Sequence, residues 1–519
     1  MSVLKKIICV IAAFLLLLTA VGCDSEEYSA SIYADIGGKV STLDPQLADS
    51  AVDRTVVLNL FSGLMRLDDQ GNAVLGAAES FERDGNTYTF TLKEGLKWND
   101  GSALTAEDFA FGLFRAADKL TNAPDYDSVS CISGADALHE GKSSSLSGVS
   151  AIDERTLKIT LSRDDRDFLK SLAKPIAMPC DKEFFQNAKG KYGRDKQNVL
   201  SNGAYYLRSW NTEDFSIRLQ RNEHYSGERP IPANVYFSAH DEAERTVLLN
   251  KNSLDLAFVP CDVSSSLNDN VAVNKYYNRC WYIFINRDGS LGNETIRRAL
   301  STAIHRSHLE NEMPEYLRPL SIAMPQTATL DGQNIFDGLL VANSQSYNPD
   351  EAYTLYESAA DSISGAAPVI IYPTDGKIES VIGEVAAGWQ QTLACFINMS
   401  AYESDSGVAS TVKNGIYTVA VSSIPANSTD AYEYLCNFKS GNPYNFSNSE
   451  FDRLVDSLPT LSGEAYINTV IAAEKLLLAD ASIIPLCISS TDLAYSTSLS
   501  GAEYNINGGY IDFSKIKKK

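Results

Sequence analysis

The sequence predicts a mixed α/β protein built from about three domains. Patterns typical of strands and of helices alternate along the chain, as in proteins in which helices pack on sheets. The 519 residues are too many for one ordinary core, because a domain usually takes about 100–200 residues. Hydrophobic residues make up 44% of the chain, which is enough for packed cores and argues against disorder.

The first clear strand and helix patterns lie between residues 88 and 117. Residues 88–92 alternate apolar side chains with threonines, which is the period of a strand with one buried face. A helix is predicted after Thr105, whose side chain can cap it, and two acids follow that suit its positive end. Apolar residues then repeat at four-residue spacing from Phe109 to Ala117, which places them on one helix face.

The same alternation continues further along the chain. Residues 157–161 have the strand period, and residues 369–372 form an apolar run typical of a buried strand. Residues 465–479 are rich in apolar side chains at helical spacing, and Pro485 lies beyond the predicted end of this helix.

The N-terminal segment predicts export. Lys5 and Lys6 precede an almost continuous apolar run over residues 7–20. This run is shorter than the ~20 residues that a membrane-spanning helix needs. Small residues follow directly before Cys23. The pattern predicts a secretory signal peptide over residues 1–22.

A cysteine at the cleavage edge resembles the lipobox of bacterial lipoproteins. The resemblance implies that Cys23 becomes the first mature residue and carries a diacylglycerol, although Ala20 stands where a leucine is usual. Two acyl chains suffice for stable attachment, so we expect a protein anchored to the outer face of the cytoplasmic membrane. An ordinary signal peptide is the alternative.

Charge and cysteine content limit the partners. The net charge of -22 repels nucleic acid at long range, so no nucleic-acid partner is expected. After Cys23, seven cysteines are scattered without a C-x-x-C pair or a zinc-ligand spacing, and no metal site is expected. Disulfides are permitted in an exported protein, and buried free thiols are the other interpretation.

An ordered series of short motifs runs through most of the chain. In order they are STLDP (41–45), NLFSGL (59–64), AESF (78–81), LKWNDG (96–101), LTAEDF (104–109), NGAY (202–205), LQRNEHY (219–225), FIN (284–286), IRRAL (296–300), AIHR (303–306), SNSEFD (447–452) and IPL (484–486). Their number and order resemble solute-binding family 5, the peptide-, dipeptide- and nickel-binding proteins of ABC importers. Residues 219–225 lack the family's proline and tryptophan, and His305 stands where an acid is usual.

The resemblance implies a two-lobed periplasmic-binding-protein fold of class II (cluster C), with an extra domain on the first lobe. Lobe I would comprise residues 27–67, 198–270 and 485–519. The extra domain would comprise residues 68–197, and lobe II residues 271–484. The ligand would be enclosed between the lobes by hinge closure.

A receptor for peptides of unrelated sequence can bind the main chain that all peptides share. Exposed strand edges supply such hydrogen bonds, and side chains then enter wet pockets. By resemblance, two facing edges would contact the ligand, at Asp49, Ser50 and Ala51 and at Ser422, Ser423 and Ile424. Tyr277 and Tyr282 match aromatic pocket positions, and Tyr126 is a weaker candidate of the same kind. For Tyr277 and Tyr282, packing between the lobes is the alternative.

One departure concerns the ligand's amino group. Oligopeptide binders usually have an acid that pairs with the ligand's free ammonium group, and Asn427 takes its place here. An amide still accepts a hydrogen bond but lacks the charge. Either Asp430 or Asp49 replaces the acid, or the ligand is not a peptide with a free N-terminus.

These features together predict an extracytoplasmic, lipid-anchored receptor of an ABC transporter that binds oligopeptides for import. Its partners would be a peptide ligand and the permease and ATPase subunits, and we expect a monomer without a cofactor. The alternatives are a non-peptide solute (metal chelate, oligosaccharide or modified peptide) and peptide sensing rather than uptake. An exported hydrolase is disfavoured because the sequence has no H-E-x-x-H or G-x-S-x-G motif.

Overall fold

The computed structural model describes residues 30–330, 333–363, 367–426, 429–444 and 446–519. The predicted signal peptide over residues 1–22, the predicted lipid-attachment residue Cys23 and the predicted ligand residue Asn427 lie outside the described residues.

A large mixed sheet runs through the described part of the chain. It has eleven strands, ten of which follow the order β17-β16-β18-β12-β19-β11-β1-β10-β9-β8, while the eleventh, β13, pairs with β19. Their bounds are β17 (Asn398–Tyr402), β16 (Val369–Pro373), β18 (Val419–Pro425), β12 (Val271–Ile285), β19 (Ile483–Ser496), β11 (Leu256–Val259), β1 (Ser31–Asp35), β10 (Asn234–Phe237), β9 (Ile217–Arg221), β8 (Tyr205–Trp210) and β13 (Leu317–Pro319).

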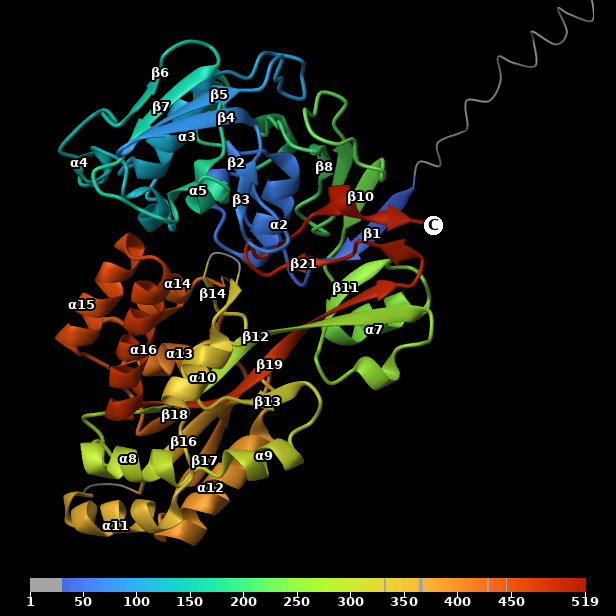
Figure 1. Ribbon diagram of the computed structural model, residues 1–519. Coiled ribbons are helices and arrows are strands. Elements are labelled where there is room, and N and C mark those ends of the chain that lie inside the picture. The colour runs from blue at the N-terminus through green and yellow to red at the C-terminus, as the bar shows by residue number, and fades with distance from the viewer. Residues whose placement is uncertain (1–29, 331–332, 364–366, 427–428, 445) are drawn as a thin grey trace, which may run out of the picture.

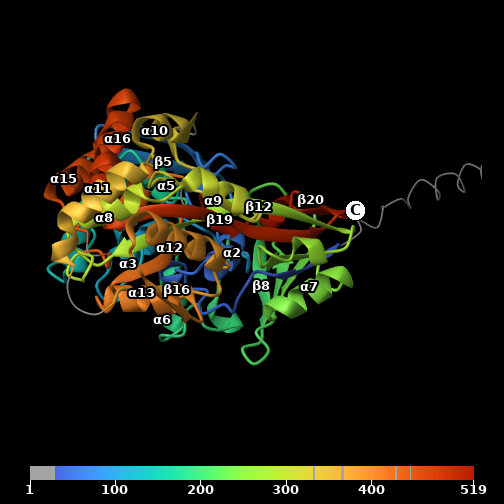
Figure 2. The same cartoon turned by 90° about the horizontal axis from the view of Figure 1, so that it is seen from below.

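Two long antiparallel strands, β12 and β19, join the two halves of this sheet (Figures 1 and 2). One end of β19 pairs with β11, and the opposite end of β12 pairs with β18. The β12–β19 register shifts between Tyr277 and Arg279 and again between Trp281 and Tyr282. Such irregularities bend and twist a strand pair, so they suit the crossing between two lobes.

Lobe I and the extra domain share one apolar core. A four-stranded sheet of the order β4-β5-β7-β6 lies in the extra domain, beside the part of the large sheet that belongs to lobe I (Figure 1). Its buried side chains, such as Phe90 and Leu157, belong to the same cluster as Ile32 and Leu219 of lobe I. The strands and the main helices of this half are β4 (Ala78–Asp84), β5 (Thr87–Leu92), β6 (Val149–Ala151), β7 (Thr156–Thr160), α2 (Ala51–Leu60), α3 (Ala106–Ala117), α5 (Phe168–Ser171) and α7 (Glu242–Asn250).

Lobe II has a separate core on each face of its sheet. Cys280, Tyr282 and Phe284 of β12 enter one cluster, and Trp281 and its alternate neighbours enter the other, as the two-residue period of a strand dictates. Its helices are α8 (Glu294–Thr302), α9 (Arg306–Glu312), α10 (Phe336–Asn343), α11 (Pro349–Ala359), α12 (Glu379–Leu393), α13 (Asp405–Lys413), α14 (Ala431–Leu435), α15 (Ser449–Ser457) and α16 (Gly463–Asp480). Figure 1 shows these helices packed around the lower half of the sheet.

The described chain also has shorter α-helices and strands. They are α4 (Ala135–His139), α6 (Lys182–Asn187), β2 (Met65–Leu67), β3 (Ala73–Leu75), β14 (Thr329–Leu330), β15 (Gln333–Asn334), β20 (Leu499–Ser500), β21 (Tyr504–Asn505), β22 (Tyr510–Ile511) and β23 (Lys517–Lys518).

The local predictions from the sequence pattern are confirmed. The predicted strands at 88–92, 157–161 and 369–372 correspond to β5, β7 and β16, and the predicted late helix corresponds to α16. Helix α3 begins directly after Thr105, which forms a capping box with Asp108. Pro485 lies beyond the end of α16, inside strand β19.

The domain limits stay a prediction, and the strand pairing shows how they divide the two long strands. The limits at residues 270/271 and 484/485 assign β12 to lobe II and most of β19 to lobe I. The pairing shows that both strands run through both halves of the large sheet.

Two further observations concern the whole described chain. Within it, no helix combines the length and the apolar character needed to cross a membrane. The seven cysteines from Cys131 to Cys487 are free thiols, of which five are buried.

Candidate ligand-binding cavity

A cavity of about 840 Å³ lies where lobe I, the extra domain and lobe II meet. Its walls come from four stretches of the chain, within residues 45–67, 124–178, 425–459 and 507–514, with Ala204 and Tyr225 between them. Cavities of about 300–1,000 Å³ are typical of ligand sites. The cavity is therefore large enough for a small organic ligand or a short peptide.

A buried ion pair holds two wall segments of this cavity together. The guanidinium of Arg115 on α3 lies 2.6 Å from Oδ2 of Asp44, and each side chain is only 4% exposed. Arg115 also donates to Oε1 of Gln46, and Gln46 in turn donates to the carbonyl oxygens of Ile176 and Met178, at 3.2 and 3.0 Å. Burial lowers the pKa of Arg115, but the charge of Asp44, the hydrogen bond to it and smaller contributions together raise it. The network thus fixes the wall segment that begins at Pro45 against the wall segment at residues 175–178.

Asp49, a predicted ligand residue, lines the cavity. Its carbonyl oxygen accepts a hydrogen bond from Arg54, at 2.5 Å, and its carboxylate lies 3.7 Å from the same guanidinium. Ser50 is the N-cap of α2 and accepts from the backbone amide of Asp53 at 3.0 Å, while Ala51 is the first residue of that helix. The predicted strand edge is thus the junction of a loop and a helix.

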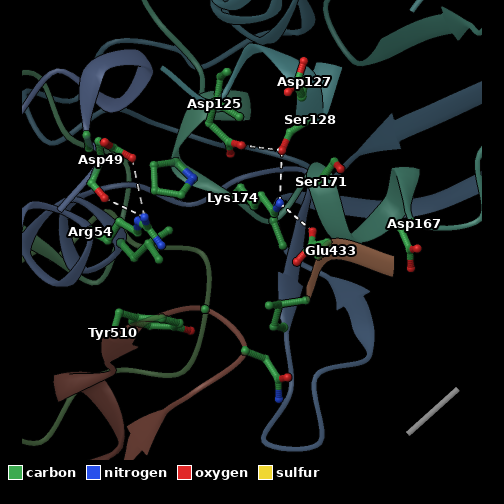
Figure 3. A pocket seen from close by; sticks show the side chains of 18 of the residues that line it. Asp49, Arg54, Asp125, Asp127, Ser128, Asp167, Ser171, Lys174, Glu433 and Tyr510 are labelled. Carbon is green, nitrogen blue, oxygen red and sulfur yellow. Dashed lines mark hydrogen bonds and ion pairs between the residues drawn. The ribbon is translucent and has the colours of Figure 1, made fainter. Parts of the chain in front are cut away.

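A second ion pair crosses from the extra domain to lobe II and faces the cavity (Figure 3). Nζ of Lys174 lies 2.8 Å from Oε1 of Glu433 and 3.0 Å from Oγ of Ser128, which donates to Asp125 at 2.8 Å. Burial lowers the pKa of Lys174, but the charges of Glu433 and Asp125 outweigh burial and raise it. Burial raises the pKa of Asp125, and the charge of Lys174 opposes that shift. Lys174 is therefore a protonated cation among carboxylates.

Asp430, at the start of the helix that carries Glu433, does not line the cavity. It is the N-cap of α14, its side chain is 4% exposed, and it lies 3.6 Å from Nζ of Lys170 and 3.9 Å from Arg166. The hydroxyl of Tyr466 donates to it at 3.2 Å. Burial, followed by the charge of Asp167, raises the pKa of Asp430 to about 6 despite the two cations.

The predicted edge at Ser422, Ser423 and Ile424 is buried within β18. All three residues pair with β12. The carboxylate of Asp405 on α13 accepts from the Ser422 hydroxyl at 2.6 Å and from the Ser423 amide at 3.2 Å. Pro425, the last residue of β18, is the one that lines the cavity. The structure therefore covers the predicted edge with Asp405.

None of the three predicted aromatic contacts lines the cavity. Tyr282 is fully buried and hydrogen-bonded to Tyr434 at 2.6 Å. Tyr277 donates to the carbonyl oxygen of Glu315 at 2.7 Å, under the guanidinium of Arg318. Tyr126 stacks on His139, with ring centroids 3.7 Å apart. The partners of Tyr277 and Tyr282 all belong to lobe II, so both tyrosines pack within that lobe and not between the lobes.

Sequence reasoning missed Lys174, Glu433 and Asp125. Lys174 stands alone in an apolar stretch and Glu433 lies in a short helix, so neither belongs to a motif. They are 259 residues apart in the chain, and only the packing of the extra domain on lobe II brings them together. In the described part of the chain, no group of three or more His, Cys, Asp or Glu side chains could hold a metal ion.

Comparison with known proteins identifies the family. The model for "Bacterial extracellular solute-binding proteins, family 5 Middle" matches residues 72–446. The chain belongs to this family. The resemblance seen in the sequence motifs is thereby confirmed.

Family 5 relatives match almost the whole chain. The periplasmic oligopeptide-binding protein OppA of Salmonella typhimurium is 26% identical over 87% of this chain and 85% of its own length. The dipeptide-binding protein of Lactococcus lactis is 24% identical over 96% of both chains. Haemophilus influenzae OppA in complex with RPPGFSPFR superimposes with a TM-score of 0.74, at 21% identity, over 95% of this chain and 99% of that one. The two-lobed α/β fold is thus confirmed.

Proposed function

We propose that this family 5 protein is the peptide receptor of an ABC importer, which binds oligopeptides in the cavity between its lobes. The observation that carries the proposal is the cavity of about 840 Å³ enclosed by lobe I, the extra domain and lobe II. Relatives named for oligopeptide and dipeptide binding match the chain over nearly its whole length, which supports the peptide as ligand.

Binding and release follow from the two-lobed geometry. Strands β12 and β19 are the continuous connection across the large sheet, and their irregular register lets the lobes rotate about them. Closure buries the ligand between cavity walls that come from opposite lobes. The protein acts by binding alone and needs neither a catalytic group nor a cofactor.

The remaining parts of the proposal concern location and partners. Cys23 carries the lipid anchor, which keeps the monomeric receptor on the outer face of the cytoplasmic membrane. There it delivers ligand to the permease, whose ATPase subunits drive import. The signal pattern over residues 1–22 supports this location.

The test is ligand-induced stabilisation of the mature protein. Residues 24–519 are purified, unfolded to remove bound ligand, refolded and screened by thermal shift against a mixed peptide library. A ligand at about 100 times its dissociation constant stabilises a protein by about 2.7 kcal/mol. We expect peptides to raise the melting temperature. A response to oligosaccharides or metal chelates instead would overturn the peptide assignment and leave the receptor fold intact.

A pair of tryptophan variants assigns the effect to the cavity. Ser440 is exposed and lines the cavity, whereas Ser144 is exposed on the extra domain and does not. Ser440→Trp is expected to reduce the peptide-induced shift by filling the cavity, and Ser144→Trp is expected to leave it unchanged. Equal responses of the two variants would show that the peptide binds elsewhere.

A further inference from the structure

The ammonium group of Lys174 faces the cavity and pairs with acidic side chains of its wall. Lys174 of the extra domain contacts Glu433 of lobe II at 2.8 Å and, through Ser128, is linked to Asp125. In Figure 3 the ammonium group of Lys174 points toward Ser128 and Glu433. All four side chains line the cavity.

Glu433 holds a special place on this wall. Among the described residues of lobe II that line the cavity, it is the single acid. Its side chain is 35% exposed and that of Lys174 is 28% exposed, so both can reach a ligand in the cavity. The carboxylate that lobe II offers to a ligand is therefore already paired with a cation of the protein.

We propose that Lys174 determines specificity by taking the place of a ligand's ammonium group at Glu433, so that the cavity accepts peptides whose amino terminus is blocked or lies elsewhere. The inference rests on the proposed function and adds to it the chemical class of the ligand.

The charges on this wall give the physical reason. A ligand ammonium group that approached Glu433 would meet the like charge of Lys174, and it would have to displace a hydrogen-bonded cation to pair with the carboxylate. A neutral group meets no such repulsion. An ammonium group has three donors, and Lys174 directs two of them at Ser128 and Glu433. The third can donate to a carbonyl oxygen of the ligand, such as that of an acetylated N-terminus.

The test compares two forms of one randomised pentapeptide library, one with free and one with acetylated N-termini. Both are titrated against the refolded protein by thermal shift, and the ratio of their apparent affinities is determined for each variant. For the wild type we expect the acetylated library to bind at least as tightly as the free one.

Lys174→Met removes the cation and keeps a side chain of similar length. The carboxylates of Glu433 and Asp125 then lack the cation of Lys174. We therefore expect the affinity for the free library, relative to that for the acetylated library, to rise by about tenfold or more. Lys174→Arg keeps the charge and is the matched control, with a ratio close to that of the wild type. The double variant Lys174→Met/Glu433→Gln is expected to lose most of the preference for free N-termini that Lys174→Met gains, because the carboxylate of Glu433 has been removed.

Two results would overturn the inference in different ways. If the wild type prefers the free library and Lys174→Met does not change the ratio, Lys174 does not replace the ligand's ammonium group, while peptide binding stands. If neither library stabilises any variant, the proposed peptide function fails and the inference fails with it. The melting temperature of each variant without peptide shows that it has folded.

Discussion

Two ion pairs beside the same cavity differ in what surrounds them. Asp44 and Arg115 are 4% exposed, and both come from the half of the molecule that contains lobe I and the extra domain, which share one core. Lys174 and Glu433 are 28% and 35% exposed and come from opposite sides of the junction with lobe II. The first pair joins two segments of one wall, and the second joins two walls.

This difference in exposure predicts which of the two ion pairs is permanent and which can open. Removing one partner from a buried pair leaves a desolvated charge, so the Asp44–Arg115 pair cannot break without a large loss of stability. A partly exposed pair is weakened by water and salt, so we expect the Lys174–Glu433 pair to open if the lobes separate. We therefore expect one wall of the cavity to stay fixed and the contact across the cavity to be reversible.

The largest effect is expected from Arg115→Met. The variant leaves Asp44 buried without its cation and removes a donor to Gln46, so the free energy of unfolding should fall by about 3–5 kcal/mol. Urea unfolding of wild type and variant measures the loss. Arg83→Met is the control, because Arg83 and its partner Asp164 are 42% and 56% exposed, and it should lose less than about 1 kcal/mol. Equal losses of stability in the two variants would contradict the expectation that the buried pair contributes more than the exposed pair.

An intermediate effect is expected from pH, through Asp430 at the start of the helix that carries Glu433. Its pKa is raised from 3.8 to about 6, so the folded protein binds this proton more tightly than the unfolded chain. The contribution of Asp430 to stability is therefore greatest at low pH and falls as the pH rises from about 4 to about 6. Asp430→Asn keeps an N-cap side chain and should lack this dependence. Urea unfolding across this range tests it, and parallel wild-type and variant curves would contradict it.

The smallest effect is expected from Glu433→Gln. Since the pair with Lys174 is partly exposed, its loss should lower the free energy of unfolding by less than about 1 kcal/mol. The difference from wild type should shrink further at high NaCl concentration, because salt screens exposed charges. Urea unfolding at low and at high NaCl concentration measures both. A loss of stability as large as that of Arg115→Met would show that the Lys174–Glu433 pair does not open.

The sequence by itself determined the local elements and the family. Alternation at 88–92 specifies a half-buried strand, and Thr105 with Asp108 specifies the start of α3, because these signals depend on neighbours a few residues away. The order of the motifs identified the family, and with it the two-lobed fold. It also predicted Asp49 as a ligand residue, and in the structure Asp49 lines the cavity.

Only the tertiary structure decided which side chains meet at the cavity. Lys174 reaches Glu433 across 259 residues of sequence, and Arg115 reaches Asp44 across 71. Asp405 covers the amide of Ser423, and Tyr282 lies in the core of lobe II. Periodicity fixes the face of an element that is buried, but it carries no information on which distant segment packs against that face. The charges that one segment brings to another, and therefore the chemistry of the cavity, arise only when the lobes and the extra domain pack together.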